Sequence, residues 1–297
     1  MDIGVGLPSH LPGARRSDIV AWARRAEELG FASVVVTDRF AYDQFEPLSV
    51  LALAGAVTER IKLRTSVMVV PNRGEAAPLA KQLASLQVLM EGRLEIGVGV
   101  GDRDIDYRLA GAQHRGRHRR LEVMLDEMRA VWDGRDEYAL VGPRPPISGI
   151  PIMIGGSGQD TWRRVAQFGT GWTFAIGSPD DFATGARGVL DAWGTRGRAG
   201  RPRLAAQRYF NLGSRHREGA DQFLRNYFAF LGPFVDPLIA GTPLDAETAG
   251  LVAEAFRQAG ADELAFLPTS ADPDELEQLA ELLIRPRHEA LTGDQGN

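Results

Sequence analysis

Short apolar runs alternate with longer amphipathic stretches along the whole chain. Eight of the short runs have the length and the β-branched content of buried strands. They cover residues 3–7, 33–37, 61–69, 93–98, 150–154, 171–176, 204–212 and 263–267. Apolar residues recur at helical spacing in the stretches 17–30, 47–58, 78–90, 121–132, 159–168, 180–193, 219–231, 246–259 and 273–284. The pattern predicts alternating strands and helices, with Ser17 as the cap of the first helix.

This alternation predicts parallel strands, because a helix after each strand carries the chain back across the sheet. Eight such units in 297 residues fit an α/β fold, the (β/α)8 TIM barrel, with one domain over 1–297. An open doubly wound sheet is the alternative, but it usually has fewer strands at this length or two visible halves. The apolar segment 232–241 is expected to be an insertion before the last strand, and the tail from about 285 is expected to fray.

Composition narrows the classes of function. The chain has no cysteine, which excludes disulfides, thiolate catalysis, iron–sulfur clusters and cysteine-ligated zinc. Its 34 basic and 39 acidic residues give a net charge of −5, which argues against sequence-independent binding to nucleic acid. No apolar run is long enough for a signal peptide or a transmembrane helix. We therefore expect a cytoplasmic protein without nucleic-acid or membrane partners.

The candidate site follows from the fold, because barrel active sites lie at the carboxyl ends of the strands. His10 follows the first predicted strand. It is either a proton-transfer group or an ordinary solvated histidine of a loop. Asp38 and Arg39 follow the second strand. They either serve the site, or Asp38 pairs with Arg39 or caps the next segment.

Two glycine-rich segments follow later strands. The fourth strand runs through Gly97 and Gly99 to Gly101 and Asp102, and Asp102 stands where a dinucleotide fingerprint needs glycine. These glycines either let the chain turn at the rim or let a flat ring approach the backbone. The fifth strand runs into Gly155, Gly156, Ser157 and Gly158 and then directly into a helix. That arrangement favours phosphate binding, and the alternative is an ordinary turn with Ser157 as the helix cap.

Metal and hydrolase motifs fail on spacing. Segment 102–106 begins like a calcium loop, but Tyr107 and Gln113 occupy the positions that need glycine and a bidentate acid. His114 and His118 lack the acid of a helical zinc motif. Neither a Gly-x-Ser-x-Gly turn nor a P-loop is present. We expect no metal.

Five segments, in order, resemble the bacterial luciferase-like superfamily of flavin- and deazaflavin-dependent oxidoreductases. They are AEELGFAS at 26–33 leading to VTD at 36–38, PL at 47–48, TERIKLRTSV at 58–67, GRLEIGVGVG at 92–101 and IPIMIGG at 150–156. The resemblance covers roughly the first 180 residues and, more weakly, the remainder. It implies a (β/α)8 barrel, a homodimer and an enzyme that moves a hydride between its cofactor and a small organic substrate.

The resemblance also implies roles for particular residues. Ser66 and Val67 fall where many members have a bulge with a non-proline cis peptide behind the cofactor ring. Asp38 matches an acid near the ring. Asp102, after Gly101, matches the acid that follows the glycine-rich strand in the F420-dependent branch. The phosphate contacts correspond to Gly155, Gly156 and Ser157, next to Gly158.

The preferred cofactor is the deazaflavin F420, because Ser66-Val67-Met68 and Asp102 resemble that branch; FMN, in a luciferase-like monooxygenase, is the alternative. Arg39 departs from members that oxidise sugar phosphates, which have histidine there, so their proton-transfer step is not carried over. A flavin-binding protein without turnover and a metal-dependent barrel hydrolase are further alternatives. The expected substrate pocket is lined by His10, Arg39, Tyr42, Phe45 and the insertion around Phe234.

Overall fold

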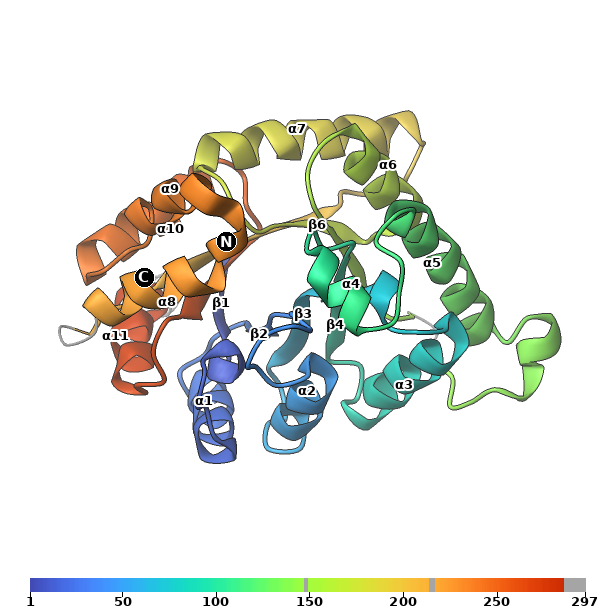
Figure 1. Ribbon diagram of the computed structural model, residues 1–297, viewed down its shortest axis with the longest axis horizontal. Helices are drawn as coiled ribbons and strands as arrows, with labels where there is room; N and C mark the ends of the chain where they lie inside the picture. Colours follow the sequence, from blue (N-terminus) through green and yellow to red (C-terminus); the bar gives the residue numbers. More distant parts are fainter. Residues whose placement is uncertain (147–148, 214–216, 286–297) are drawn as a thin grey trace, which may run out of the picture.

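The computed structural model describes residues 1–146, 149–213 and 217–285. Within these residues eight parallel strands pair in sequence order, and β8 pairs with β1, so that the sheet closes (Figure 1). The strands are β1 (Asp2–Gly6), β2 (Ser33–Val36), β3 (Lys62–Val69), β4 (Leu94–Gly99), β5 (Ile152–Gly155), β6 (Gly171–Phe174), β7 (Arg203–Phe210) and β8 (Glu263–Pro268). The predicted (β/α)8 barrel is confirmed. The open doubly wound sheet is not formed.

Crossover helices surround the barrel. They are α1 (Arg16–Glu28), α2 (Pro47–Gly55), α3 (Ala76–Leu89), α5 (Arg117–Asp133), α6 (Gln159–Phe168), α7 (Pro179–Thr195), α10 (Ala246–Gln258) and α11 (Asp274–Leu283). Outside the insertion described below, four short elements of the described residues were not predicted: η1 (Pro8–His10), η2 (Val70–Asn72), α4 (Asp104–Leu109) and η3 (Asp136–Leu140). Each is too short to produce a hydrophobic period that the sequence alone reveals.

Local chemistry moves some helix ends away from the predicted positions. α1 begins at Arg16, before the predicted cap Ser17, because the Asp18 carboxylate already accepts the Arg15 backbone N–H at 2.9 Å. α5 begins earlier than the predicted residue 121, since its first turn is polar and carries no apolar period. Gly134 ends α5 with a φ of +62°, the left-handed conformation that glycine adopts without a Cβ penalty.

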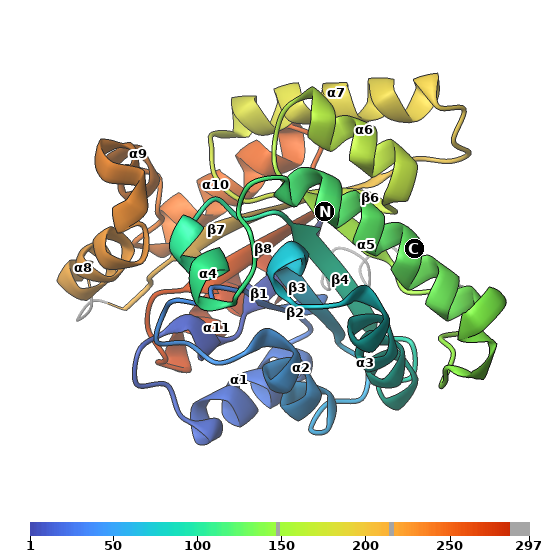
Figure 2. The same ribbon diagram turned by 45° about the vertical axis from the view of Figure 1, so that its right-hand side comes forward.

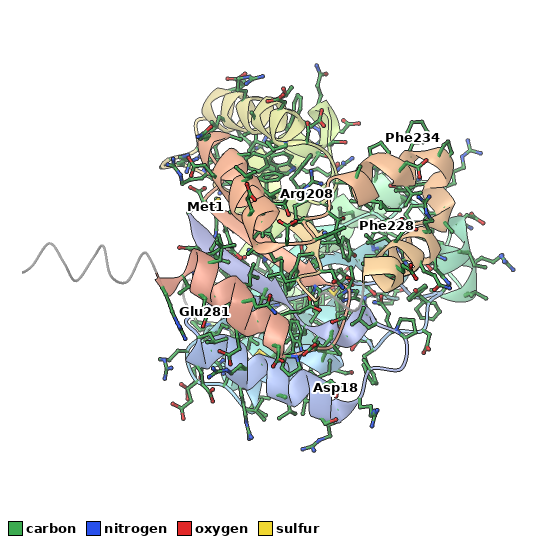
Figure 3. All side chains as sticks on the ribbon, turned by 90° about the vertical axis from the view of Figure 1, so that its left-hand side faces the viewer. Met1, Asp18, Arg208, Phe228, Phe234 and Glu281 are labelled. Atoms are coloured by element: carbon green, nitrogen blue, oxygen red, sulfur yellow. The ribbon has the colours of Figure 1, made fainter. Side chains whose placement is uncertain are left out.

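The insertion before the last strand is larger than the predicted segment 232–241. It contains α8 (Arg217–Tyr227), η4 (Ala229–Phe234) and α9 (Val235–Ala240), which stand to one side of the ring of helices (Figure 2). Phe228 packs on Tyr209 of β7 with ring centroids 5.4 Å apart. Figure 3 shows Phe228 and Phe234 at the opposite end of the molecule from Met1. The insertion therefore covers the carboxyl ends of the strands.

An ion network fills the barrel at the opposite end, where the strands begin. Arg64 of β3 pairs with Glu95 of β4 at 3.1 Å and with Glu263 of β8 at 2.7 Å. Arg203 of β7 pairs with Glu263 at 2.6 Å, and the Ser33 hydroxyl donates to the same carboxylate at 2.6 Å. Burial raises the pKa of Glu263, but Arg64 and Arg203 outweigh it and lower that pKa to about 2. The network ties five strands together around one ionised carboxylate.

None of the helices in the described ranges combines the length and the hydropathy that a bilayer span requires. The predicted frayed tail lies almost entirely outside the described residues, which end at 285.

Candidate functional site

A cavity of about 190 Å³ opens at the carboxyl ends of the strands, beneath the insertion. We call it the mouth cavity. It brings together residues that the sequence analysis selected from three successive strands: Asp38, Ser66, Val67, Gly101 and Asp102. Arg39 also lines it. The remaining lining residues are Thr37, Val69, Arg103, Asp106, Ala175, Ile176, Gln207, Tyr209, Tyr227, Phe228 and Phe230.

The floor of the mouth cavity contains a bulge in β3. The register between β3 and β4 shifts between Thr65 and Met68, and the Ser66–Val67 peptide is cis. The Ser66 hydroxyl donates to Gln207 Oε1 at 2.8 Å and lies 3.3 Å from the Thr173 hydroxyl. The bulge is therefore joined to the opposite wall of the barrel by a side-chain bridge.

The glycines of β4 and β5 have a steric explanation at this bulge. A Cβ on Gly97 would lie 2.1 Å from the Thr65 carbonyl oxygen. Cβ atoms on Gly99 and Gly155 would lie 2.7 Å and 2.6 Å from the methyl groups of Val67. These glycines leave space for the bulge of β3. The sequence analysis had predicted either a turn at the rim or the approach of a flat ring, and neither prediction included this role.

Asp38 connects the ends of β2 and β3. Its carboxylate accepts the Val69 backbone N–H at 2.9 Å and pairs with Arg73 at 2.8 Å. Arg73 also pairs with Glu46 at 2.5 Å. Burial alone would lower the pKa of Arg73, but the two carboxylates raise it. Asp38 thus does not pair with Arg39, contrary to the alternative offered by the sequence.

Arg39 points toward the insertion instead. Its guanidinium lies 3.6 Å from the ring centroid of Tyr227, donates to the Tyr227 carbonyl oxygen and lies 5.0 Å from the ring centroid of Phe230. The residue is 8% exposed. Within the described part of the chain, the structure shows no carboxylate within ion-pair distance of this guanidinium. Arg39 is therefore a buried cation held by aromatic faces.

Burial raises the pKa of the Tyr227 hydroxyl, and the adjacent Arg39 cation offsets only part of this rise. The hydroxyl lies 3.2 Å from Thr37 Oγ1 and 3.2 Å from Gln44 Oε1, within hydrogen-bond distance of both. Burial likewise raises the pKa of Tyr209 well above its ordinary value. Both phenols are neutral at physiological pH.

His10 is neither a solvated histidine nor part of the cavity lining. It is 1% exposed, and its Nε2 lies 2.9 Å from the Pro268 carbonyl oxygen. The rings of Tyr209, Phe223 and Tyr227 surround it at 5.7 to 5.9 Å between centroids. Burial lowers its pKa to about 4. His10 is thus a neutral packing residue between β8 and the insertion.

Asp102 lies at the exposed edge of the mouth cavity. Its side chain is 81% exposed and lies 3.6 Å from the Arg117 guanidinium. Arg117 also donates through Nε to the Gly101 carbonyl oxygen at 3.0 Å. The acidic segment 102–106 leads into α4, where Asp106 accepts the Ala41 backbone N–H at 2.8 Å. No group of three potential metal ligands occurs in the described ranges.

The turn after β5 presents exposed backbone. Gly156 and Gly158 have φ values of +121° and +84°, and Gly158 is the N-cap of α6. Ser157 is therefore not the cap, contrary to the alternative from sequence. Because the cap residue is glycine, no side chain covers the first N–H groups of α6. The Thr161 hydroxyl donates to the Ser157 carbonyl oxygen at 3.0 Å and steadies the turn.

The structure does not place the residues expected around the substrate in one cavity. Phe45 lines a neighbouring hollow of about 410 Å³ that shares Asp38 and Arg39 with the mouth cavity. Phe234 lines a different cavity, because the chain kinks at Gly232 inside η4 and carries it away.

Sequence reasoning missed Arg73, Gln207, Tyr227, Phe228 and Phe230. For Tyr227, Phe228 and Phe230, the available signal was the dense aromatic spacing of segment 223–234.

The chain is similar to a family of known proteins. A family model described as luciferase-like monooxygenase matches residues 1–281. The chain belongs to this family. It is 31% identical over 177 residues to an uncharacterised protein of Mycobacterium tuberculosis, covering 54% of this chain and 60% of that protein. It is 30% identical over 195 residues to an F420-dependent glucose-6-phosphate dehydrogenase of Nocardia farcinica, covering 59% and 58% of the two chains.

The matched segments thus span less than two thirds of these relatives. Among solved structures, an F420-dependent secondary alcohol dehydrogenase, in complex with an F420–acetone adduct, superposes with a TM-score of 0.80 at 19% identity. That superposition covers 95% of this chain and 98% of the other. It shows that the two share a fold.

Proposed function

We propose that the protein is an F420-dependent oxidoreductase that transfers a hydride between the deazaflavin and a small organic substrate. The observation that carries the proposal is the mouth cavity, where Asp38, the Ser66–Val67 bulge and Asp102 meet at the ends of β2, β3 and β4. The F420-dependent relative and the family membership support the choice of cofactor. When bound, the deazaflavin would supply the hydride donor or acceptor.

The chain offers separate places for the ring and the phosphate of the cofactor. The backbone of Ser66 and Val67 would support the ring, because the bulge forms the cavity floor and is fixed by Gln207. The turn of Gly156, Ser157 and Gly158 would bind the phosphate through uncapped N–H groups at the start of α6. Positive φ at both glycines lets this backbone adopt its open turn.

Arg39 would act on the substrate as a fixed positive charge. An arginine cannot take up a proton in place of a histidine base, because it is always protonated. Because Arg39 is buried beside aromatic rings, the low local dielectric would strengthen its electrostatic interaction with a bound substrate. It would therefore polarise a substrate carbonyl and stabilise the negative charge that develops on its oxygen during hydride addition. The proton that completes the alcohol would come from solvent at the open cavity.

The other predicted site residues take supporting roles in this proposal. Asp38 would hold the β3 end in place through Val69 and Arg73, next to the ring. Asp102 and Gly101 would contact the exposed edge of the cofactor. His10 would position the insertion above the cavity, since it has no surface toward the substrate.

We also propose that the protein is a cytoplasmic homodimer; sedimentation equilibrium of the purified protein tests the dimer.

Equilibrium titration of the purified protein with F420 and with FMN tests the proposed function. We expect micromolar or tighter binding of F420 and binding of FMN at least tenfold weaker. Reduced F420 should then be oxidised in the presence of small ketones or aldehydes, which the return of its absorbance measures. Tighter binding of FMN, with reduction of oxygen, would make the protein a flavin monooxygenase instead. Binding of neither cofactor would contradict the proposal.

A further inference from the structure

A further cavity, of about 510 Å³, lies outside the barrel wall between α7, α9 and α10. We call it the outer cavity. It is distinct from the mouth cavity, although Ile176 lines both. Its single cation is Arg208 of β7, whose neighbours Gln207 and Tyr209 line the mouth cavity instead. Because side chains alternate along a strand, Arg208 points to the outer face of the barrel (Figure 3).

Arg208 is buried without a partner. It is 8% exposed, and its Nε has neither solvent nor an acceptor. In the described part of the chain, the structure shows no hydrogen bond or ion pair for its guanidinium; its contact is with the ring of Phe256, at 5.4 Å from the centroid. Burial accordingly lowers its pKa.

The charge of Asp181 raises the pKa of Arg208 and partly offsets the effect of burial. The hydrogen bonds of Asp181, however, are to Ser178. Its Oδ2 accepts the Ser178 backbone N–H at 2.8 Å and the Ser178 hydroxyl at 2.7 Å, which caps α7. Asp181 therefore serves the helix start and leaves the guanidinium free. An unpaired buried cation destabilises a fold unless something else compensates it.

The remaining walls of this cavity are mostly apolar. Leu238 of α9 and Val252, Ala255 and Phe256 of α10 line its interior. Three large apolar side chains stand exposed at its rim: Ile176 at 42%, Phe234 at 77% and Leu251 at 64%. Asp181 also lines the cavity, but its carboxylate is engaged by Ser178. Mostly apolar walls around one unpaired cation suit a molecule with an apolar body and a single anionic group.

We propose that this outer cavity binds a small amphiphilic anion, an alkyl or aryl carboxylate or phosphate ester, whose charged group pairs with Arg208. The apolar body lies against α9 and α10. This site is independent of the cofactor site, so it stands even where the proposed function fails.

Isothermal titration calorimetry with octanoate and octyl phosphate, each below its micellar concentration, tests the proposal. We expect one of the two to bind with 1:1 stoichiometry and to define the charged group, with octanol at least tenfold weaker and octyltrimethylammonium not bound. The Arg208→Met variant should lose at least tenfold in affinity, and Arg208→Lys should retain most of it. Two variants serve as controls: Arg39→Met in the mouth cavity and Arg257→Gln, an exposed arginine of α10. Neither should change the affinity.

The thermal midpoint without ligand gives a second readout. Arg208→Met should unfold at the wild-type temperature or above it, because the variant removes an uncompensated charge. A lower midpoint would show that Arg208 stabilises the fold through contacts of its own and would overturn the proposal. It would also be overturned by wild-type affinity in Arg208→Met, by equal affinity for octanol, by loss of binding in Arg39→Met, or by no binding of either anion to the wild type.

Discussion

The barrel buries an arginine at each end, and the surroundings of the two are opposite. Arg64, where the strands begin, is 1% exposed and pairs with Glu95 and Glu263. Arg39, where the strands end, is 8% exposed and rests on aromatic rings without a carboxylate in the described ranges. The first arrangement is closed and leaves nothing for a ligand. The second leaves charge available, which is the distinction expected between the stabilising and the functional end of a barrel.

The largest effect is expected at the closed end. Glu263→Gln removes the charge that Arg64 and Arg203 share, so that the buried Arg64 keeps only Glu95 and the partly buried Arg203 keeps only Asp2. We expect a loss of about 3–5 kcal/mol in the free energy of unfolding, measured by urea denaturation, with F420 affinity unchanged in the folded protein. Glu254→Gln is the matched control, because Glu254 pairs with Arg257 at the exposed surface of α10. A loss as small as that of the control would contradict the closed network.

At the mouth, Arg39→Met should give the reverse result. The free energy of unfolding should stay the same or rise, since the variant removes a buried charge without a carboxylate partner. Turnover of reduced F420 with a ketone should fall about hundredfold, or roughly 3 kcal/mol, as for the loss of one oxyanion donor. Arg39→Lys should recover only part of the rate, because a lysine lacks the planar fork. Lower stability with full turnover would reverse the assignment of the two ends.

His10 makes the mouth end sensitive to acid. Burial lowers its pKa from 6.5 to about 4, so the unfolded chain takes up a proton before the folded one does. Stability from this group is fully present above pH 6.5 and is lost as the pH falls toward 4. Between pH 7 and pH 5, wild type should lose about 2 kcal/mol more than His10→Phe. Equal losses, measured by urea denaturation at both pH values, would show that His10 titrates normally.

The smallest effect concerns the turn after β5. Gly156→Val places a Cβ 2.9 Å from the Thr161 hydroxyl at a φ of +121°, so the turn must change shape. We expect F420 to bind at least tenfold more weakly, about 1.4 kcal/mol, in a folded protein. Gly200→Val carries the same type of φ strain in a turn with open space around it. If both variants bind F420 like wild type, the phosphate lies elsewhere.

The sequence predicted the backbone of both ends, because strand and helix periods repeat eight times and define the barrel almost by themselves. It also selected Asp38 and Asp102, since strand ends converge in this fold, and Ser66 through the resemblance to the luciferase-like family. Their partners were not predictable. Asp38 pairs with Arg73 rather than with the adjacent Arg39, because the fold brings the end of β3 beside β2. Chain neighbours were the only partners that the sequence could suggest.

The insertion was the second source of error. Its apolar residues were recognised, but not the direction in which each points. Phe228 and Phe230 line the mouth cavity, while the kink at Gly232 carries Phe234 to the outer cavity. His10 was likewise predicted from the sequence to be accessible at the rim. Its burial depends on Phe223 and Tyr227, more than 200 residues later in the chain.

Hydrogen–deuterium exchange with and without F420 tests most directly whether the open end is the binding end. F420 should slow exchange in peptides that cover 62–69, 99–103 and 155–160, and should leave peptides at the strand starts around Ser33 and Glu263 unchanged. Protection confined to α7, α9 and α10, or protection at no peptide at saturating F420, would contradict the assignment of the mouth cavity as the cofactor site.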